Sequence, residues 1–398
     1  MVKYSSPQTQ FASRLVPCVC TMVFACFSFC YLYLYQPGYL AQMQYHCSYG
    51  ETTYHPLVGA VLITLPLLAL GIFLHKAVRW PLCLCAISWA PSAWLLALAT
   101  SVRFPELPDY GSGTPALALA IFLAASLLVA VLLRLHPDAT SEHGTLAGYL
   151  SSNLLLLSLL FLVTGVLGYS SVSGHRELRM GRLLHEGRYD QAVLCTTDTA
   201  AVTYRLYALR AAALACEGRL GESLFEYPIP QGTRTLMPRQ SDSLFVYDAL
   251  PVLYRVMRAV PRCTGEFHEQ VFLRNALEAD TLPRPLTLDY LLCSCLLRGK
   301  VGTFCQLLTS HTDSLSTSLP RHYREALVLS HHVLKWGGDG MGTHALQPCL
   351  DYSDEDMEAS YRSFRRLHDA ARSGSGAASD SLACYAGTYW AYYAARFQ

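Results

Sequence analysis

The stretch GRLLHEGRYDQAVL (Gly181–Leu194) predicts a helix, a stop and a second helix. Leu183 and Leu184 continue an apolar pattern with roughly helical spacing. Gly187 supplies the left-handed residue with which helices commonly end. The small side chain of Ala192 lets the second helix cross the first closely. The stretch therefore predicts a hairpin of two α-helices of the kind found in water-soluble domains.

The same spacing recurs around Gly218 and around Gly299. Each glycine is followed two positions later by Tyr, Leu or Val, and five positions later by Ala, Ser or Phe. This spacing resembles the helix–turn–helix joint of tetratricopeptide (TPR)-like repeats, whose period is about 34 residues. Gly218 follows Gly187 by 31 residues and Gly299 follows Gly218 by 81, so a repeat array would be degenerate. A set of unrelated helical hairpins is the alternative.

The rest of residues 173–398 also predicts α-helices, and the fold class expected for the chain is all-α. Helix-length amphipathic segments follow one another, such as RHYREALVLSHHVLKW and DSLACYAGTYWAYYAARF. Before the segment DEDMEASYRSFRRLHDAAR, Ser353 can cap a helix whose first residues are acidic. We expect a soluble helical domain over residues 173–398.

Residues 1–172 have a different composition. They contain six Lys or Arg and five Asp or Glu, whereas the whole chain contains 30 and 29. Only 15% of the chain is charged, against about 25% in a typical soluble domain. Net charge is near zero, so no basic surface for nucleic acid is expected.

Five apolar stretches in residues 1–172 are long enough to cross the hydrocarbon core, which takes about 20 residues. None contains Asp, Glu, Lys or Arg, which argues against a transport pathway, and Asn153 is their main strongly polar residue. Pro91 could kink the third stretch. A cleaved signal peptide is the alternative for the first stretch. The predicted spans are residues 15–35, 57–74, 82–100, 116–133 and 146–167.

Positive charges in the short loops predict the orientation, because Lys and Arg favour the cytoplasmic side. Five basic residues lie in the N-terminal segment and in the loops on the same side of the membrane, and one, Arg103, lies in a loop on the opposite side. This asymmetry places the N-terminus in the cytoplasm. Five spans then place residues 173–398 outside the cytoplasm, in the periplasm of a bacterial inner membrane. The five are Lys3, Arg14, Lys76, Arg79 and Arg134.

Three stretches resemble a known family. LRAAALACEGRLGESLFEYPIPQG (residues 209–232), LPRHYREALVL (residues 319–329) and TYWAYYAARFQ (residues 388–398) are similar to an uncharacterised family of Bacteroidota membrane proteins, known as a domain of unknown function. The resemblance implies a polytopic N-terminal half and a TPR-like tail. It implies no activity, so it assigns no catalytic residue.

We find no catalytic, cofactor or metal signature. The fifteen cysteines include no Cys-x-x-Cys, and the eight in residues 173–398 are expected to be mostly unpaired and buried. His268–Glu269 begins like a zinc-protease helix, but Phe272 stands where the second histidine should be. His331, His332 and His344 could meet around the glycine-rich residues 337–342, although a flexible connector is the simpler reading.

The function expected from these observations is an envelope scaffold or recruitment protein that sits in the lipid bilayer and binds a protein or peptide. Four side chains on one predicted helix are the candidate partner-binding residues: Tyr204, Arg205, Tyr207 and Arg210. The alternative is that the two tyrosines are buried in the core and bind no partner. The alternative function is a membrane enzyme that acts on a lipid-linked glycan or another envelope substrate through a carboxylate of an outer loop. The loop carboxylates are Glu51, Glu106 and Asp109.

Overall fold

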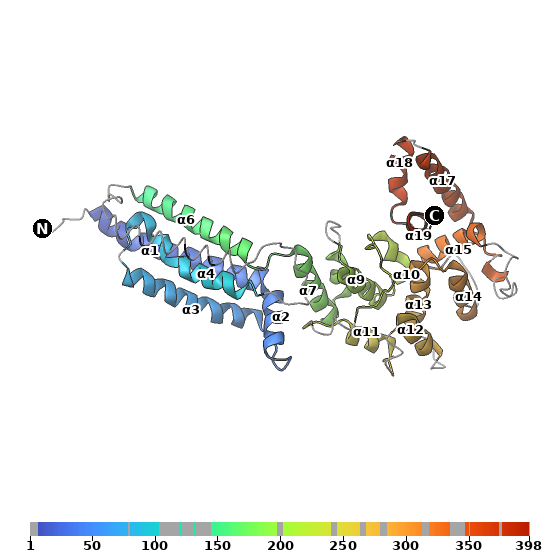
Figure 1. Ribbon diagram of the computed structural model, residues 1–398, viewed down its shortest axis with the longest axis horizontal. Coiled ribbons are helices and arrows are strands. Elements are labelled where there is room, and N and C mark those ends of the chain that lie inside the picture. The colour runs from blue at the N-terminus through green and yellow to red at the C-terminus, as the bar shows by residue number, and fades with distance from the viewer. Residues whose placement is uncertain are drawn as a thin grey trace. The chain divides into compact units, whose positions relative to one another are not determined.

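The computed structural model divides the chain into two compact units (Figure 1). The first comprises Met1–His175 with Leu244–Val246, and the second comprises Arg176–Ser243 with Tyr247–Gln398. The structure describes residues 7–78, 80–102, 120, 124, 131, 145–196, 202–239, 245–262, 268–278, 285–312, 318–334, 347–349, 351–373 and 376–397. All regular structure in these residues is helical.

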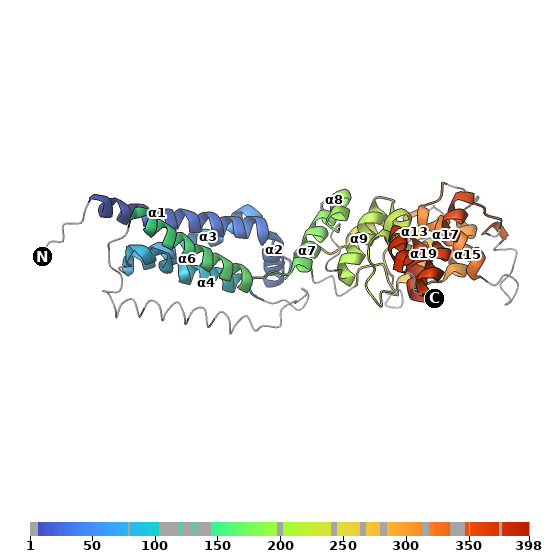
Figure 2. The same cartoon turned by 90° about the horizontal axis from the view of Figure 1, so that it is seen from above.

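Four helical segments of the first unit are long and apolar enough to cross a membrane, and they lie side by side (Figures 1 and 2). They agree with four of the five predicted spans. The predicted span at residues 116–133 lies outside the described residues apart from three helical positions. The four segments are Gln10–Tyr35, Pro56–Ala77, Leu82–Ala99 and Leu146–Leu167.

These segments are built from several elements. Helix α1 (Pro7–Cys30) continues as the π-helical turn η1 (Tyr31–Tyr35). Helix α3 (Pro56–Ala77) is the second segment and α6 (Leu146–Leu167) is the last. The short helix α2 (Pro37–Cys47) follows η1 and begins at a proline, which is favourable at a first helical position.

The third segment is not one continuous α-helix. It begins as the 3-10 helix η2 (Leu82–Trp89) and becomes α4 (Ala90–Ala99). Leu84 leaves helical geometry, with φ −129° and ψ 15°. Pro91 lies in the first turn of α4, where the missing N–H costs nothing. The predicted distortion near Pro91 is therefore a change of helix type that spans the first half of the segment.

Asn153 of α6 provides the hydrogen bonds that this irregular backbone lacks. Its Oδ1 accepts the N–H of Ala86 at 2.7 Å, and its Nδ2 donates to the carbonyl of Leu82 at 2.7 Å. Nδ2 also donates to Tyr149 in its own helix. Non-helical backbone inside a membrane is stable only when protein groups satisfy it. Asn153, the main strongly polar residue of the predicted spans, is thus the hydrogen-bond partner of the irregular third segment.

Trp89 packs at the centre of the first unit. Its ring stacks on Phe24 of α1 with centroids 4.7 Å apart. A Cβ added to Gly71 of α3 would lie 2.3 Å from the Trp89 ring, so only glycine lets the two segments come this close. Ser92 of α4 donates to the carbonyl of Leu67 at 2.8 Å and joins the same two segments. The bundle is held by aromatic packing and by neutral hydrogen bonds.

The second unit is a set of helices packed around one core. Helices α9 and α13 lie in this core and are buried on all sides, and large buried side chains also come from α15 and α19, such as Tyr323 and Trp390. Its helices are α7 (Val172–His185), α8 (Tyr189–Leu194), α9 (Tyr204–Cys216), α10 (Leu220–Ser223), α11 (Leu250–Met257), α12 (Glu269–Glu278), α13 (Pro285–Leu297), α14 (Val301–His311), α15 (Arg321–Val333), α17 (Glu355–Arg372), α18 (Gly376–Leu382) and α19 (Tyr389–Phe397).

All three predicted helix–turn–helix joints are confirmed. Gly187, Gly218 and Gly299 have φ values of 75°, 70° and 68°, and each ends a helix. The same pair of backbone bonds closes each joint. At the first, the Gly187 N–H donates to Leu184 at 3.1 Å and the Arg188 N–H to Leu183 at 2.9 Å. This pattern is the Schellman motif, in which a residue with positive φ lets the last carbonyls be satisfied.

The three stretches that carry the family resemblance meet in one buried cluster. His322 and Glu325 of α15 are 0% and 1% exposed. The N–H of Phe225 donates to His322 Nε2 at 3.3 Å, so this nitrogen carries no proton. His322 therefore donates from Nδ1 to Glu325 at 3.0 Å.

Glu325 accepts two more hydrogen bonds, from the N–H of Tyr389 at 2.7 Å and from Nε of Arg321 at 2.9 Å. The indole of Trp390 donates to the Glu325 carbonyl at 2.7 Å. A glutamate paired with a histidine can activate a nucleophile, but here the histidine faces a buried backbone N–H. We therefore assign Glu325 and His322 to holding α15, α19 and the segment after α10 together.

Candidate functional site

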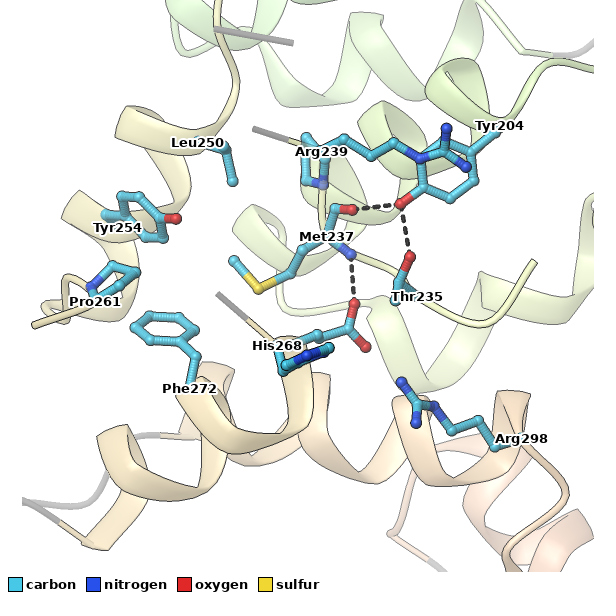
Figure 3. Close-up of a pocket in the computed structure, with 12 residues that line it drawn as sticks. Tyr204, Thr235, Met237, Arg239, Leu250, Tyr254, Pro261, His268, Phe272 and Arg298 are labelled. Atoms are coloured by element: carbon cyan, nitrogen blue, oxygen red, sulfur yellow. Dashed lines mark hydrogen bonds between the residues drawn. The ribbon is translucent and has the colours of Figure 1, made fainter. Parts of the chain in front are cut away.

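A pocket of about 300 Å³ opens in the second unit between α9, α11, α12 and the end of α13 (Figure 3). We call it the Tyr204 pocket. Its volume is at the lower end of the range for small-molecule sites. His268 and Arg239 are exposed at its edge, so the pocket is reached from solvent.

One wall of the Tyr204 pocket is apolar. Leu250 and Tyr254 come from α11, Phe272 comes from α12, and Pro261 lies between these helices. Figure 3 shows these four side chains together on one side of the pocket. Tyr254 and Phe272 contact each other edge to face, with centroids 5.5 Å apart. This wall can hold an apolar side chain.

The opposite wall is polar and carries two arginines. Tyr204, at the start of α9, donates its hydroxyl to the carbonyl of Met237 at 2.6 Å, and Thr235 Oγ1 lies 2.8 Å from the same hydroxyl. The guanidinium of Arg239 lies over the Tyr204 ring, 4.2 Å from its centroid, in a cation–π contact. Arg298 follows α13 and its guanidinium points toward the pocket in Figure 3.

Glu269 positions the polar wall. It is the first residue of α12 and is buried, and it accepts the N–H groups of Leu236 and Met237 at 2.6 and 2.8 Å. Ser294 of α13 donates to its other oxygen at 2.6 Å. Burial raises the pKa of Glu269, and these three hydrogen bonds oppose the rise because they favour the carboxylate. The Glu269 side chain thus holds the extended segment 233–239 against two helices.

The structure brings one of the four predicted partner-binding residues to this pocket. Tyr204 lines it, whereas Tyr207 is 0% exposed and lies in the core. Arg205 is 8% exposed, 3.8 Å from the carboxylate of Glu177. The two tyrosines therefore differ, and Tyr207 agrees with the core alternative. A role in partner binding remains a prediction for all four.

Arg210 is also turned inward. It is 9% exposed, donates to the carbonyl of Val193 at 3.3 Å, and lies 5.1 Å from the ring centroid of Tyr227. Helix α9 is buried on all sides and therefore offers no exposed face to a partner. The alternating Tyr and Arg residues in its sequence did not indicate this burial. Changes at Arg205 or Arg210 would test folding before they tested binding.

Sequence reasoning missed most of the pocket. Glu269 and His268 were noted only as part of an incomplete zinc motif, and Arg239 and Arg298 were not singled out. No local signal was available, because Glu269 holds Met237 from 32 positions away. Among the loop carboxylates, Glu51 is exposed, while Glu106 and Asp109 lie outside the described residues.

The histidines and cysteines of the second unit have ordinary protein contacts. His331 lies 2.7 Å from the carbonyl of Cys349, and His332 lies 3.6 Å from Glu358. His344 and the glycine-rich residues lie outside the described part of the chain. Within the described part, no three potential metal ligands cluster. Four cysteines are buried as free thiols: Cys293, Cys295, Cys305 and Cys349.

The fold defines a class: an all-helical protein in which a bundle of candidate membrane spans is followed by a unit of helical hairpins. The chain belongs to the family of unknown function DUF6057, which matches residues 12–255 and 248–396. No curated protein matches the chain, and no solved structure does.

Proposed function

We propose that this protein is a membrane-anchored scaffold or recruitment protein, and that its second unit holds a protein or peptide partner. The observation that carries the proposal is the Tyr204 pocket, which sets an apolar wall opposite two arginines. Buried aromatic and arginine side chains are the usual centres of binding energy. The pocket's volume suits one or two side chains of a partner.

A TPR-like arrangement is part of the proposal. The three Schellman joints support it, because stacked helical hairpins produce concave surfaces that bind extended partners. The hairpins are unequal, however: the helices after the joints have 6, 4 and 11 residues, while those before them have 14, 13 and 13. We therefore propose that the repeat is degenerate rather than regular. We also propose that the family is one of bacterial membrane proteins from Bacteroidota.

The second unit is proposed to face the periplasm of a bacterial inner membrane, with the N-terminus in the cytoplasm. The five-to-one charge asymmetry of the earlier loops supports this side. The flank after the last span opposes it, because Arg176, Arg179 and Arg182 of α7 follow the end of α6 within 15 residues. The orientation therefore needs a direct test.

Reporter fusions at Asp138 and Gly174 provide that test. Alkaline phosphatase is active only outside the cytoplasm, and a cytoplasm-only fluorescent protein reports the other side. We expect fluorescence at Asp138 and phosphatase activity at Gly174, because the last span separates them. Fluorescence without phosphatase activity at Gly174 would overturn the proposed side.

Site-specific photo-crosslinking tests partner binding. A benzoylphenylalanine at His268, on the exposed edge of the Tyr204 pocket, should give a discrete adduct in cells. The matched control is Arg366, exposed on α17, where we expect none. The proposal fails if the pocket position gives no adduct, or if both positions give the same one.

A further inference from the structure

The strongest unexplained feature of the second unit is the charge on the polar wall of the Tyr204 pocket. Nε of Arg298 donates to the carbonyl of Arg234 at 3.0 Å, which fixes the guanidinium plane. No carboxylate of the described residues lies within 4.0 Å of this guanidinium. The edge of the fork that points toward the pocket is suited to a planar anion.

The pocket's own carboxylate does not supply that anion. Glu269 is committed to two backbone N–H groups and to Ser294. The lining therefore contains one carboxylate that is already engaged, two arginines and His268. A ligand that brings a negative charge matches this wall.

The opposite wall decides what must accompany the charge. Leu250 and Phe272 are 6% and 3% exposed, and Tyr254 lies between them in Figure 3. An anion without an apolar part would leave this wall without a ligand group against it, while a purely apolar ligand would leave the pocket-facing edge of the Arg298 guanidinium without an anion. The two walls together fit an apolar group with an anion next to it.

A carboxylate fits the donors better than a phosphate. A phosphate has three acceptor oxygens and up to two charges, and it usually draws on several arginines or on a set of backbone N–H groups. Here the N–H groups of Leu236 and Met237 are occupied by Glu269. One fixed guanidinium remains, and its fork matches the two oxygens of a carboxylate.

We propose that the Tyr204 pocket binds a carboxylate carried next to an apolar side chain, as at the C-terminal residue of a peptide. The carboxylate pairs with Arg298, Arg239 adds positive charge at the edge, and the side chain lies against Phe272 and Leu250. This inference rests on the proposed binding function and names its ligand class. A free apolar amino-acid derivative has the same chemistry, so the test includes both sources.

The test uses the full chain in nanodiscs of zwitterionic lipid and a fluorescein-labelled peptide, Gly-Ser-Gly-Phe, with a free C-terminal carboxylate. Fluorescence anisotropy should show saturable binding. The same peptide with a C-terminal amide should bind at least about tenfold more weakly, because a charged hydrogen-bonded pair contributes at least about one factor of ten. N-acetylphenylalanine should compete if the free acid is sufficient.

Arg298→Gln should weaken the acid peptide about tenfold and make acid and amide bind alike. Arg239→Gln, at an exposed position, should weaken binding of the acid peptide less, and Arg366→Gln on α17 should change nothing.

Three results would each overturn the proposal: equal affinity of acid and amide for the wild type, no binding of either, or unchanged discrimination in a folded Arg298→Gln protein. Displacement by inorganic phosphate but not by N-acetylphenylalanine would identify a phosphate site instead. A pocket crosslink at His268 with no carboxylate preference would reject the ligand class and leave the proposed function standing.

Discussion

Each unit contains a buried polar side chain that joins segments far apart in the chain, and the two side chains differ in charge. Asn153 bonds to Leu82 and Ala86 in the first unit, and Glu325 bonds to Arg321, His322 and Tyr389 in the second. A neutral amide suits a unit whose surroundings are apolar, because it leaves no charge to be solvated.

A carboxylate can be used in the second unit because the chain supplies enough donors around it. Glu325 accepts three hydrogen bonds, one of them from an arginine. A buried charge is stable only when it is paired and hydrogen-bonded. The comparison teaches that the number of donors, more than burial itself, decides whether a charge can be placed in a core.

The largest effect is expected for Glu325→Gln. The amide cannot accept from all three donors, and it leaves Arg321 with only the exposed carboxylate of Glu226, 3.7 Å away. Arg321 is 37% exposed, so the loss comes mainly from the buried acceptor, at which each hydrogen bond to a charged group contributes about 1.5–3 kcal/mol. Hydrogen exchange on the full chain should show faster exchange in α15 and α19.

The control for this change is Glu358→Gln, whose carboxylate pairs with Arg362 and His332 at the surface and should cost about 0.5 kcal/mol or less. Unchanged protection of α15 and α19 in Glu325→Gln would contradict the importance of this cluster.

Asp289 sharpens the comparison, because it is a carboxylate with fewer donors. Tyr323 donates to it at 3.0 Å, and burial raises its pKa from 3.8 to about 6. The folded protein therefore binds this proton more tightly than the unfolded chain does. The stability that Asp289 contributes is present below pH 4 and is lost as the pH rises through 6.

Asp289→Asn removes this pH dependence because an amide does not titrate. The amide oxygen can still accept the hydrogen bond from Tyr323. The variant should be more stable than the wild type at pH 8, by at most about 3 kcal/mol, and the difference should shrink toward pH 4. Thermal unfolding across this range measures it, with Asp380→Asn at an exposed position as the control. A stability difference that is the same at both pH values would disagree with the raised pKa.

Asn153→Leu should have a smaller effect. It removes the bonds to Ala86 and Leu82, and interhelical hydrogen bonds in membrane proteins contribute about 0.6 kcal/mol each on average. We expect a loss of about 1–2 kcal/mol, measured by thermal unfolding in detergent, with faster exchange of the Ala86 amide. Ser151→Ala, an exposed residue bonded within its own helix, is the control. An unaltered Ala86 amide would show that other groups support the broken segment.

The cysteines give the smallest effect, because no change in stability is involved. Cys293, Cys295, Cys305 and Cys349 are buried like apolar side chains, as the sequence predicted, whereas Cys195 and Cys216 are half-buried and Cys384 is exposed. Whether they stay unpaired is still a prediction. Thiol labelling after non-reducing denaturation, followed by peptide mass spectrometry, should modify most of the eight cysteines of residues 173–398. Six or more unmodified cysteines would reveal a disulfide framework instead.

The sequence by itself determined the features that depend on neighbours along the chain. Apolar length predicted four segments that the structure describes as candidate spans, because crossing a bilayer sets a minimum length. Gly187, Gly218 and Gly299 predicted the three hairpin joints, because a positive φ is a local requirement that glycine meets best. The match of residues 12–255 and 248–396 to one family is likewise a property of the sequence.

Only the tertiary structure decided which polar side chains meet. Asn153 was conspicuous in the sequence, but its partners lie 67 and 71 positions away. Helical spacing did not distinguish Tyr204, which lines the pocket, from Tyr207, which is buried in the core. The pocket itself exists because Glu269 holds a segment more than 30 residues distant against two helices. Such contacts depend on how whole helices pack, and no short window of sequence contains that information.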